Sequence, residues 1–535
     1  ATSLEATRKS QHAHGVSVAH VRLEDGNWKV VVPSSYNRRI HANTPFLLTG
    51  PAAGHAMLQT AADPTGTVSL GTINNCGNGY TMWGTYLTCE ENFNGYFGTA
   101  RENPRVDKRD AAQRRYGVSQ DSTSNGWETQ DARFDYVANP NEANRMGWIV
   151  EIDPQDPTST PRKRTALGRF SHESATTIVA PDGRVVVYMG DDDKFEYAYK
   201  FVSRGRFDPK NAAANRDLLD HGTLYAARFD ASGRGEWLPL VHDEKGPLNS
   251  KAGFKDQGAV VIKCRAAADL MGATPMDRIE DFEPNPLTGR VYMACTKNAD
   301  REQRSRRDQY MGREIELGVD IANPRAKNDY GHIIEVIERG DDPTSRTFAW
   351  NVFILAGDPR NAETKFLTRR DDIAPGKVSR GDTYYAGYAA RDAVSPIACP
   401  DNVGFDPSGR LWIVTDSDHD LANDGCFVVP THGAERGRLK QIVSAPVGAE
   451  VTGCEFTPDG KTVLVARMGG GGLAGFEAAT GRYLGTLLDF VPNPRHILIS
   501  PDGRILYASG NQSGAVGRYD LAAMLRALAG AAGKR

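Results

Sequence analysis

One short phrase, repeated along the chain, decides the fold. It first reads Pro181-Asp182-Gly183-Arg184 and is followed by the alternating apolar run 185–189. Proline, aspartate and glycine favour a tight turn, and an alternating apolar run after such a turn is typical of a half-buried strand. Four further copies precede apolar runs at 291–294, 411–415, 463–466 and 505–508.

The spacing of these turns predicts a β-propeller. The glycines of the last three copies, Gly409, Gly460 and Gly503, lie 51 and 43 residues apart. This is the length of one four-stranded propeller blade with its loops. The earlier intervals of 106 and 120 residues each fit two blades with insertions. We therefore expect an all-β protein, a six-bladed β-propeller, with a large β-sandwich or two β-domains as the alternative.

The composition agrees with one large domain that is rich in turns. The 535 residues include 55 Gly and 29 Pro, and this much glycine without a collagen period indicates many short strands. Residues 148–152 and 332–336 read as further strands, and helical periodicity is nearly confined to 521–528. The polar segments 100–145 and 300–328 are expected to be long insertions between blades of a single domain that spans 1–535.

The charge balance excludes some partners. With 64 Lys and Arg against 67 Asp and Glu, the net charge of -3 argues against nucleic acid or an anionic membrane as the main partner. No apolar run approaches the ~18 residues that a membrane span needs. The twin arginine Arg38-Arg39 is not followed by the apolar segment of an export signal, so these residues do not reveal the compartment.

Acidic residues recur at corresponding places along the predicted blades. Each group alone could be a solvated turn, but propeller loops converge on the axis, so the recurrence favours a shared site. Carboxylates are ligands for hard cations such as calcium, and a thiol beside them adds a ligand for iron. The groups are Cys89-Glu90-Glu91, His172-Glu173, Asp191-Asp192-Asp193, Arg278 with Glu280, Asp401 with Asp416, Asp418 and Asp424, and Glu450 with Cys454 and Glu455.

Several familiar catalytic motifs are absent from the sequence. There is no GxSxG elbow, no P-loop and no dinucleotide-binding fingerprint, and Thr176 stands where HExxH would require histidine. The seven cysteines form no CxxC pair. A carboxylate-rich set with few histidines favours calcium or ferric iron over zinc or copper.

Several strings resemble the PhoX family of bacterial alkaline phosphatases, and the resemblance runs over nearly the whole chain. The most specific string is Trp83-Gly84-Thr85-Tyr86-Leu87-Thr88-Cys89-Glu90-Glu91-Asn92. The others are Asn75-Cys76 with Gly79-Tyr80-Thr81, His172-Glu173, Arg278-Ile279-Glu280-Asp281 and Asn323-Pro324-Arg325.

The resemblance implies a monomeric phosphatase exported by the twin-arginine route to the periplasm or outside the cell. It implies an axial site with two ferric irons (Fe3+), three calcium ions (Ca2+) and a bridging oxo group. Cys89 is carried over as an iron ligand, Glu173 and Glu280 as carboxylates near the irons, and Arg278 as the arginine that contacts substrate. The missing export signal agrees with a mature, cleaved chain.

These observations give one expected function and two rivals. We expect an alkaline phosphatase that hydrolyses small-molecule phosphoester substrates, phosphate monoesters, at an iron and calcium site, with Arg278 holding a phosphoryl oxygen. A calcium-dependent lactonase or phosphodiesterase on a propeller would need fewer carboxylates and no thiolate, and a non-enzymatic binding propeller would hold no metal tightly. The candidate metal ligands are Cys89, Glu90, Glu91, Glu173, Asp192, Glu280, Asp401 and Glu450, of which Asp192, Asp401 and Glu450 rest on composition and blade position.

Overall fold

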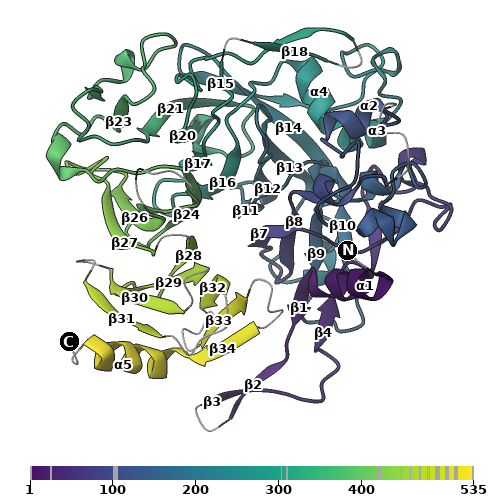
Figure 1. Cartoon of the computed structure of the whole chain (residues 1–535), viewed down its shortest axis with the longest axis horizontal. Coiled ribbons are helices and arrows are strands. Elements are labelled where there is room, and N and C mark those ends of the chain that lie inside the picture. The colour runs from purple at the N-terminus through teal and green to yellow at the C-terminus, as the bar shows by residue number, and fades with distance from the viewer. Residues whose placement is uncertain are drawn as a thin grey trace.

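The computed structural model shows a ring of antiparallel β-sheets (Figure 1). Among the residues it describes, no helix combines the length and the apolar character needed to cross a membrane. The described residues are 3–24, 27–100, 107–302, 304–308, 311–417, 421, 423–446, 449–457, 459–468, 472–478, 480, 482–487, 494–499, 505–510 and 516–532.

The chain enters the ring through a six-stranded sheet in the order β6-β5-β10-β9-β8-β7. All its pairings are antiparallel except that between β10 and β5. Its strands are β5 (Pro45–Thr49), β6 (Val68–Leu70), β7 (Asn75–Tyr80), β8 (Tyr86–Glu90), β9 (Ile149–Ile152) and β10 (Arg162–Arg164).

The middle of the chain forms two antiparallel meanders that merge into one eleven-stranded sheet. They join at their outer strands, where β15 pairs with β21. The first meander is β11 (Thr176–Val179), β12 (Arg184–Gly190), β13 (Ala198–Arg206), β14 (Gly222–Phe229) and β15 (Arg234–Pro239). The second is β16 (Ile279–Pro284), β17 (Val291–Cys295), β20 (His332–Glu338) and β21 (Thr347–Leu355), extended by β22 (Phe366–Leu367) and β23 (Thr383–Tyr385).

Three separate meanders complete the ring. The first is β24 (Pro400–Phe405), β25 (Arg410–Thr415), β26 (Gly425–Pro430) and β27 (Lys440–Ser444), and the second is β28 (Glu450–Phe456), β29 (Thr462–Met468), β30 (Leu473–Glu477) and β31 (Tyr483–Leu487). The last is β32 (Pro494–Ile499), β33 (Ile505–Gly510) and β34 (Val516–Asp520).

The innermost strand of each run faces the centre of the ring. These strands are β7, β11, β16, β24, β28 and β32. Contacts join β7 with β11, β16 with β24, β24 with β28 and β28 with β32. This arrangement confirms the predicted all-β propeller. The number of blades stays a prediction, because two meanders share one sheet and the first sheet takes in two extra strands, β5 and β6.

The repeated turn phrase joins β11 to β12, β16 to β17, β24 to β25 and β28 to β29. Gly183 has a φ of 86° between β11 and β12, a conformation that glycine adopts without the strain a side chain would bring. The predicted strands after the phrase are confirmed as β12, β17, β25, β29 and β33, although the turn 501–504 lies outside the described residues. A further turn of this kind, with Gly84 at φ 90°, joins β7 to β8 and lacks the proline and aspartate of the phrase.

Strands in the middle of the blades are buried on both faces rather than on one. Val185 and Val187 of β12 pack into one core, while Val186 and Tyr188 on the opposite face pack into another. The alternation of the sequence therefore predicted the strands but not their burial. Each blade of a propeller lies between two neighbours, so both of its faces are covered.

Shorter elements surround the ring. The helix predicted at 521–528 is confirmed as α5 (Leu521–Ala532), whereas α1 (Leu4–Ala13), α2 (Ala111–Arg115), α3 (Gln257–Ile262) and α4 (Cys264–Met271) were not predicted. Two small hairpins are β2 (Val21–Glu24) with β3 (Asn27–Val30) and β18 (Ser305–Arg307) with β19 (Glu314–Glu316), and β1 (Val16–Val18) pairs with β4 (Arg38–Ile40).

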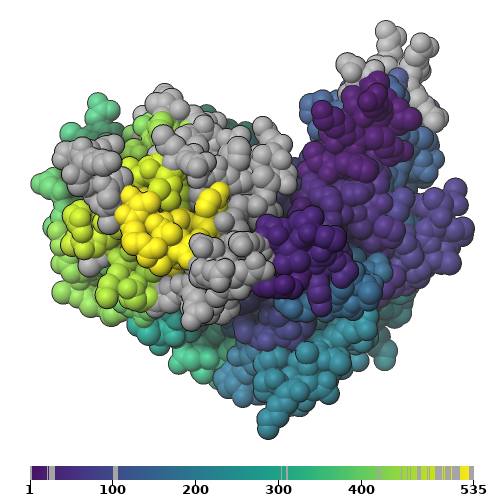
Figure 2. Space-filling view, turned by 90° about the horizontal axis from the view of Figure 1, so that it is seen from below, coloured from purple at the N-terminus to yellow at the C-terminus, as the bar shows by residue number. Residues whose placement is uncertain are grey.

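The last meander of the ring contacts the N-terminal segment. Strand β3 contacts β34 (Figure 1), and the yellow C-terminal helix lies on the face of the molecule that the turned view presents (Figure 2). The insertions predicted at 100–145 and 300–328 contain α2 and the β18–β19 hairpin in their described parts. Their place within a single domain stays a prediction.

Candidate metal centre

Polar side chains gather where the innermost strands begin. Cys76, Glu280 and Asp401 are each the second residue of such a strand, and Glu450 is the first residue of another. Four of these strands have an irregular pairing with their neighbour at this point, in β7, β16, β24 and β28. A β-bulge bends a strand and re-aims a side chain, so these irregularities explain how polar residues turn out of the blades.

The structure brings five residues with metal-competent side chains into one group, which we call the axial cluster. Ligand atoms of Cys76, Glu91 and Glu173 lie within 4.8 Å of one another, and the same holds for Glu173, Asp192 and Glu280. The shared residue Glu173 joins the two sets, and its Oε1 accepts a hydrogen bond from the Cys76 thiol at 2.9 Å. All five residues are buried.

A second group of carboxylates lies on the next two blades. Ligand atoms of Asp401, Asp416 and Glu450 come within 4.8 Å of one another, and Asp416 is exposed. We call this group the outer cluster. It is electrostatically close to the axial cluster, because Asp401 raises the pKa of both Glu173 and Glu280.

Arg278 lies against the axial cluster. Its Nη2 donates to Oδ2 of Asp192 at 2.7 Å and lies 3.3 Å from Oε1 of Glu280. The side chain is 29% exposed, so it is open to a molecule that enters from solvent. Within the described part of the chain, its Nε and Nη1 make no hydrogen bond to another residue, which leaves donors for a ligand.

The charges of the axial cluster are unfavourable without cations. Burial, followed by repulsion from neighbouring carboxylates, raises the pKa of Glu173 and of Glu280 well above the usual range. The same causes raise the pKa of Asp401 well above its usual range. Buried carboxylates of like charge become stable as anions when a multivalent cation lies between them.

The donor set fits metal ions. The buried Oδ1 of Asp192 has no hydrogen-bond partner among the described residues, and a bound cation would satisfy this oxygen. Carboxylate oxygens suit calcium, and a cysteine sulfur beside two carboxylates suits iron. The residues present therefore fit a site for both kinds of metal.

Two expected ligands lie elsewhere. Cys89 packs in the hydrophobic core with Leu87 and Ile149, and burial, followed by the nearby charges of acids that include Glu173 and Glu91, raises the pKa of its thiol well above the usual range. Glu90 points away from the axial cluster and pairs with Lys163 at 2.7 Å. In the part of the chain that the structure describes, neither residue belongs to a group of metal-competent ligand atoms.

Cys76 is the cysteine that the sequence reasoning passed over. It lies in the string Asn75-Cys76, but the adjacent acids Glu90 and Glu91 favoured Cys89 as the predicted ligand. The available signal was its place at the start of an innermost strand. Of the other candidates, Asp418 lies outside the described residues, and Arg325 is fully buried with Nη2 donating to the backbone oxygens of Ala356 and Asp382.

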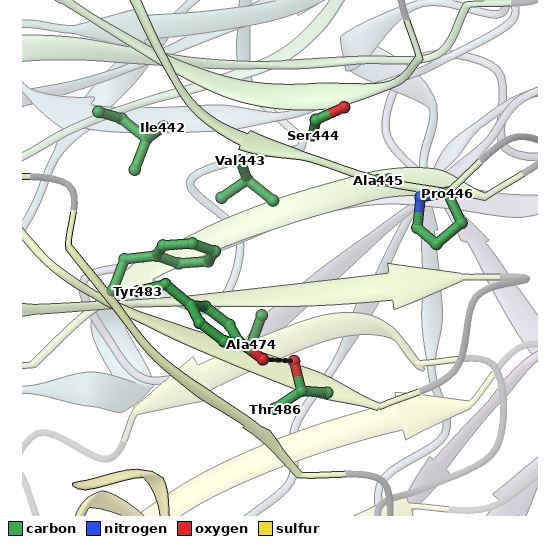
Figure 3. Close-up of a pocket in the computed structure, with 9 residues that line it drawn as sticks. Ile442, Val443, Ser444, Ala445, Pro446, Ala474, Tyr483 and Thr486 are labelled. Carbon is green, nitrogen blue, oxygen red and sulfur yellow. Dashed lines mark hydrogen bonds between the residues drawn. The ribbon is translucent and has the colours of Figure 1, made fainter. Parts of the chain in front are cut away.

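A cavity of about 440 Å³ lies between β27, β30 and β31 and has no charged lining (Figure 3). Tyr483 and Thr486 share a hydrogen bond of 2.7 Å at its edge. The lining residues are Ile442, Val443, Ser444, Ala445, Pro446, Ala474, Phe476, Tyr483 and Thr486, and none belongs to the axial or outer cluster. The cavity therefore lacks the groups that phosphoryl chemistry requires.

Fold and site together define a metal-dependent hydrolase on a β-propeller. Residues 1–469 match the family described as alkaline phosphatase PhoX. The structure of Pseudomonas fluorescens PhoX in complex with vanadate, a transition state analogue, is 43% identical to the chain, with a TM-score of 0.72. The match covers 87% of this chain and 76% of that one. The chain belongs to the PhoX family, and it is an alkaline phosphatase.

More distant structures add no functional argument. A protein from Lactobacillus plantarum is 10% identical with a TM-score of 0.36, over 89% of this chain and 92% of that one. The periplasmic gluconolactonase of Pseudomonas aeruginosa is 15% identical with a TM-score of 0.27, over 70% of this chain and 92% of that one. No curated protein matches the chain.

Proposed function

We propose that the axial and outer clusters hold iron and calcium, and that Arg278 binds the phosphoryl group of a phosphate monoester beside them. One observation carries this proposal: a thiol and four carboxylates converge at the axis, and Arg278 bridges two of those carboxylates. In place of Cys89, Cys76 is the cysteine assigned to iron, with Glu91 and Glu173 beside it.

The thiol in the axial cluster supports a phosphatase site over the rival propeller enzymes. A lactonase or phosphodiesterase that uses calcium alone has no need for sulfur, because calcium prefers oxygen ligands. Cys76 contacts Glu173 directly, so the sulfur is part of the ligand set rather than of the surrounding core. The resemblance to the PhoX family supplies the bridging oxo group of this proposal.

In phosphate ester hydrolysis, the acidic clusters would hold the metals and Arg278 would bind the phosphoryl group. Bound iron and calcium supply positive charge that stabilises the negative charge of the phosphoryl group in the transition state. Asp192 and Glu280 hold Arg278 by its Nη2, which orients the planar guanidinium. Its other N–H groups are then placed to donate to a phosphoryl oxygen with the two-donor geometry that arginine provides.

Arg278→Lys tests the substrate role. Lysine keeps the charge but cannot reproduce the planar fork, so kcat/KM for an aryl phosphate should fall by roughly 10–100-fold, the cost of about one charge-assisted hydrogen bond. The metal content, measured by elemental analysis, should stay at the wild-type value. Full activity in this variant would contradict the assignment of Arg278.

Vanadate gives a second test of the same site. The similar P. fluorescens protein binds vanadate as a transition state analogue. We expect vanadate to inhibit this enzyme competitively and the Arg278→Lys variant to bind it more weakly. Export to the periplasm or the cell exterior and a monomeric state are further parts of the proposal, to be checked by cell fractionation and by light scattering.

A further inference from the structure

Three residues of the proposed site directly follow a buried acid. Glu91 and Asp192 of the axial cluster and the substrate arginine Arg278 are preceded by Glu90, Asp191 and Asp277. Each of these three acids is 0% exposed. Successive side chains of an extended chain point to opposite sides, so when the second residue faces the axis, the acid before it points into the protein.

The first acid is held from strand β10 of the same sheet, with β9 between them. The Nζ of Lys163 lies 2.7 Å from Oε1 of Glu90, and both side chains are 0% exposed. The other oxygen, Oε2, accepts hydrogen bonds from the backbone N–H groups of Gly147 at 2.9 Å and Trp148 at 3.1 Å. Glu90 is therefore fixed at both oxygens.

The second acid is held from helix α4. Arg265 binds Asp191 with two parallel contacts, Nη2 to Oδ1 at 2.5 Å and Nε to Oδ2 at 2.8 Å. The backbone N–H of Ser171 also donates to Oδ1 at 3.2 Å. This geometry fixes the plane of the carboxylate as well as its position.

The third acid is held from the insertion at 300–328. Nε of Arg301 donates to Oδ1 of Asp277 at 2.5 Å, and Nδ2 of Asn328 donates to Oδ2 at 2.9 Å. The side chain of Asn323 accepts a hydrogen bond from the backbone N–H of Asp277 at 3.0 Å. The insertion thus surrounds the residue that precedes Arg278.

We propose that these three pairs, Glu90–Lys163, Asp191–Arg265 and Asp277–Arg301, are anchor pairs that position Glu91, Asp192 and Arg278 for metal and phosphate binding. Stability alone does not account for them, because replacing a whole buried ion pair by neutral residues of similar size is often neutral or even stabilising. Their value lies in holding the adjacent side chain in one place, as supporting contacts do for metal ligands. The proposal rests on the proposed function of the axial cluster.

The chain offers a matched control pair. Lys200 and Glu338 are 1% and 3% exposed, and Nζ lies 2.9 Å from Oε1. The residue after Glu338 is the exposed Arg339, which belongs to neither cluster. This pair has the burial and geometry of an anchor pair without a site residue beside it.

The test compares double variants that neutralise one pair at a time: Glu90→Gln/Lys163→Met, Asp191→Asn/Arg265→Met, Asp277→Asn/Arg301→Met and the control Glu338→Gln/Lys200→Met. Metal release to a chelator and the affinity for inorganic phosphate are measured on the full chain. The first two variants should lose metal about 10–100-fold faster, the range seen for residues that support metal ligands. The third should keep its metal and bind phosphate roughly 10-fold more weakly, the loss of about one hydrogen bond.

The control variant should change neither measurement, whatever its melting temperature. If the anchor variants behave like the control, the proposal is overturned. For an anchor variant that does not fold, Glu90→Asp, Arg265→Lys or Arg301→Lys keeps the charge and displaces the contact. Glu90→Asp and Arg265→Lys should release metal faster, whereas Arg301→Lys should keep its metal and bind phosphate more weakly. Failure of these conservative variants to fold would also count against a positioning role.

Direct variants separate this inference from the proposed function. Glu91→Gln should weaken metal binding, and Arg278→Lys should weaken phosphate binding. If these two variants match the wild type, the proposed site is wrong. If they lose binding while the anchor variants do not, only the anchoring inference fails.

Discussion

Cys76 and Cys89 lie on the paired strands β7 and β8, and both thiols are buried, yet their direct contacts differ. The sulfur of Cys76 contacts the carboxylate of Glu173 in the axial cluster. Cys89 packs against apolar side chains of the core. The consecutive acids Glu90 and Glu91 differ in the same way, because one pairs with Lys163 and the other joins the cluster.

In the proposed site, facing the axis, rather than burial or acidity, separates a site residue from a structural one. The acids at the axis have too few fixed cations around them to balance their charge, so a bound metal ion would stabilise their ionised form. Glu90 and Asp191, which point into the protein, each pair with a buried cation.

Metal removal should have the largest effect. Exhaustive chelation should lower phosphatase activity by roughly 10²–10³-fold or more, since metals supply several kcal/mol of transition-state stabilisation. It should also lower the melting temperature, because ions that bind only the folded protein stabilise it. Activity and calorimetry are measured before and after metal is restored, and unchanged values would remove the metal from the mechanism.

The two cysteines should respond differently to the same substitution. Cys76→Ser removes a soft ligand, so iron content should fall and activity should drop by roughly 10–100-fold or more. Ferric iron bound to thiolate gives a charge-transfer band in the visible, and this band should bleach in Cys76→Ser.

Cys89→Ser is the matched variant on the interior side. A hydroxyl replaces a thiol in an apolar core, so stability should fall by about 1–3 kcal/mol. Colour, iron content and kcat should stay near the wild-type values. If Cys89→Ser lost its colour and activity while Cys76→Ser kept both, Cys89 would be the iron ligand, as the sequence predicts.

The smallest effect concerns an interior acid on β20. Burial alone would raise the pKa of Glu335, but Arg436, with Nη2 2.9 Å from Oε2, and the Tyr292 hydroxyl, 2.6 Å from Oε1, lower it below the usual range. The stabilisation is therefore present above the unfolded pKa of ~4.3 and is lost as pH falls through the folded value.

Glu335→Gln should flatten this acid dependence. Its free energy of unfolding should lie about 1–2 kcal/mol below wild type at neutral pH, and the difference should shrink in acid. Unfolding by denaturant at several pH values, with metal present throughout, measures the free energy of unfolding of both proteins. Activity at neutral pH should not change, and a loss of activity with normal stability would place Glu335 on the functional side of the comparison.

The sequence by itself determined the strands that follow the repeated turn phrase. The phrase around Gly183 needs only local chemistry, namely a residue that accepts positive φ and an alternating run after it. The resemblance identified the family and pointed to Glu173, Glu280 and Arg278, which the structure brings together. Each turn phrase and each family string is a short run of consecutive residues, so the sequence alone can show it.

Only the tertiary structure decided which neighbour of a pair faces the axis. Glu90 and Glu91, or Asp191 and Asp192, are equivalent in composition, and a shift of one position reverses their sides. That choice is set by bulges and by buried partners from distant segments, such as Lys163 on β10 and Arg265 on α4. Cys76 and Glu173, 97 residues apart, meet because neighbouring blades share the axis, and no local pattern records such a contact.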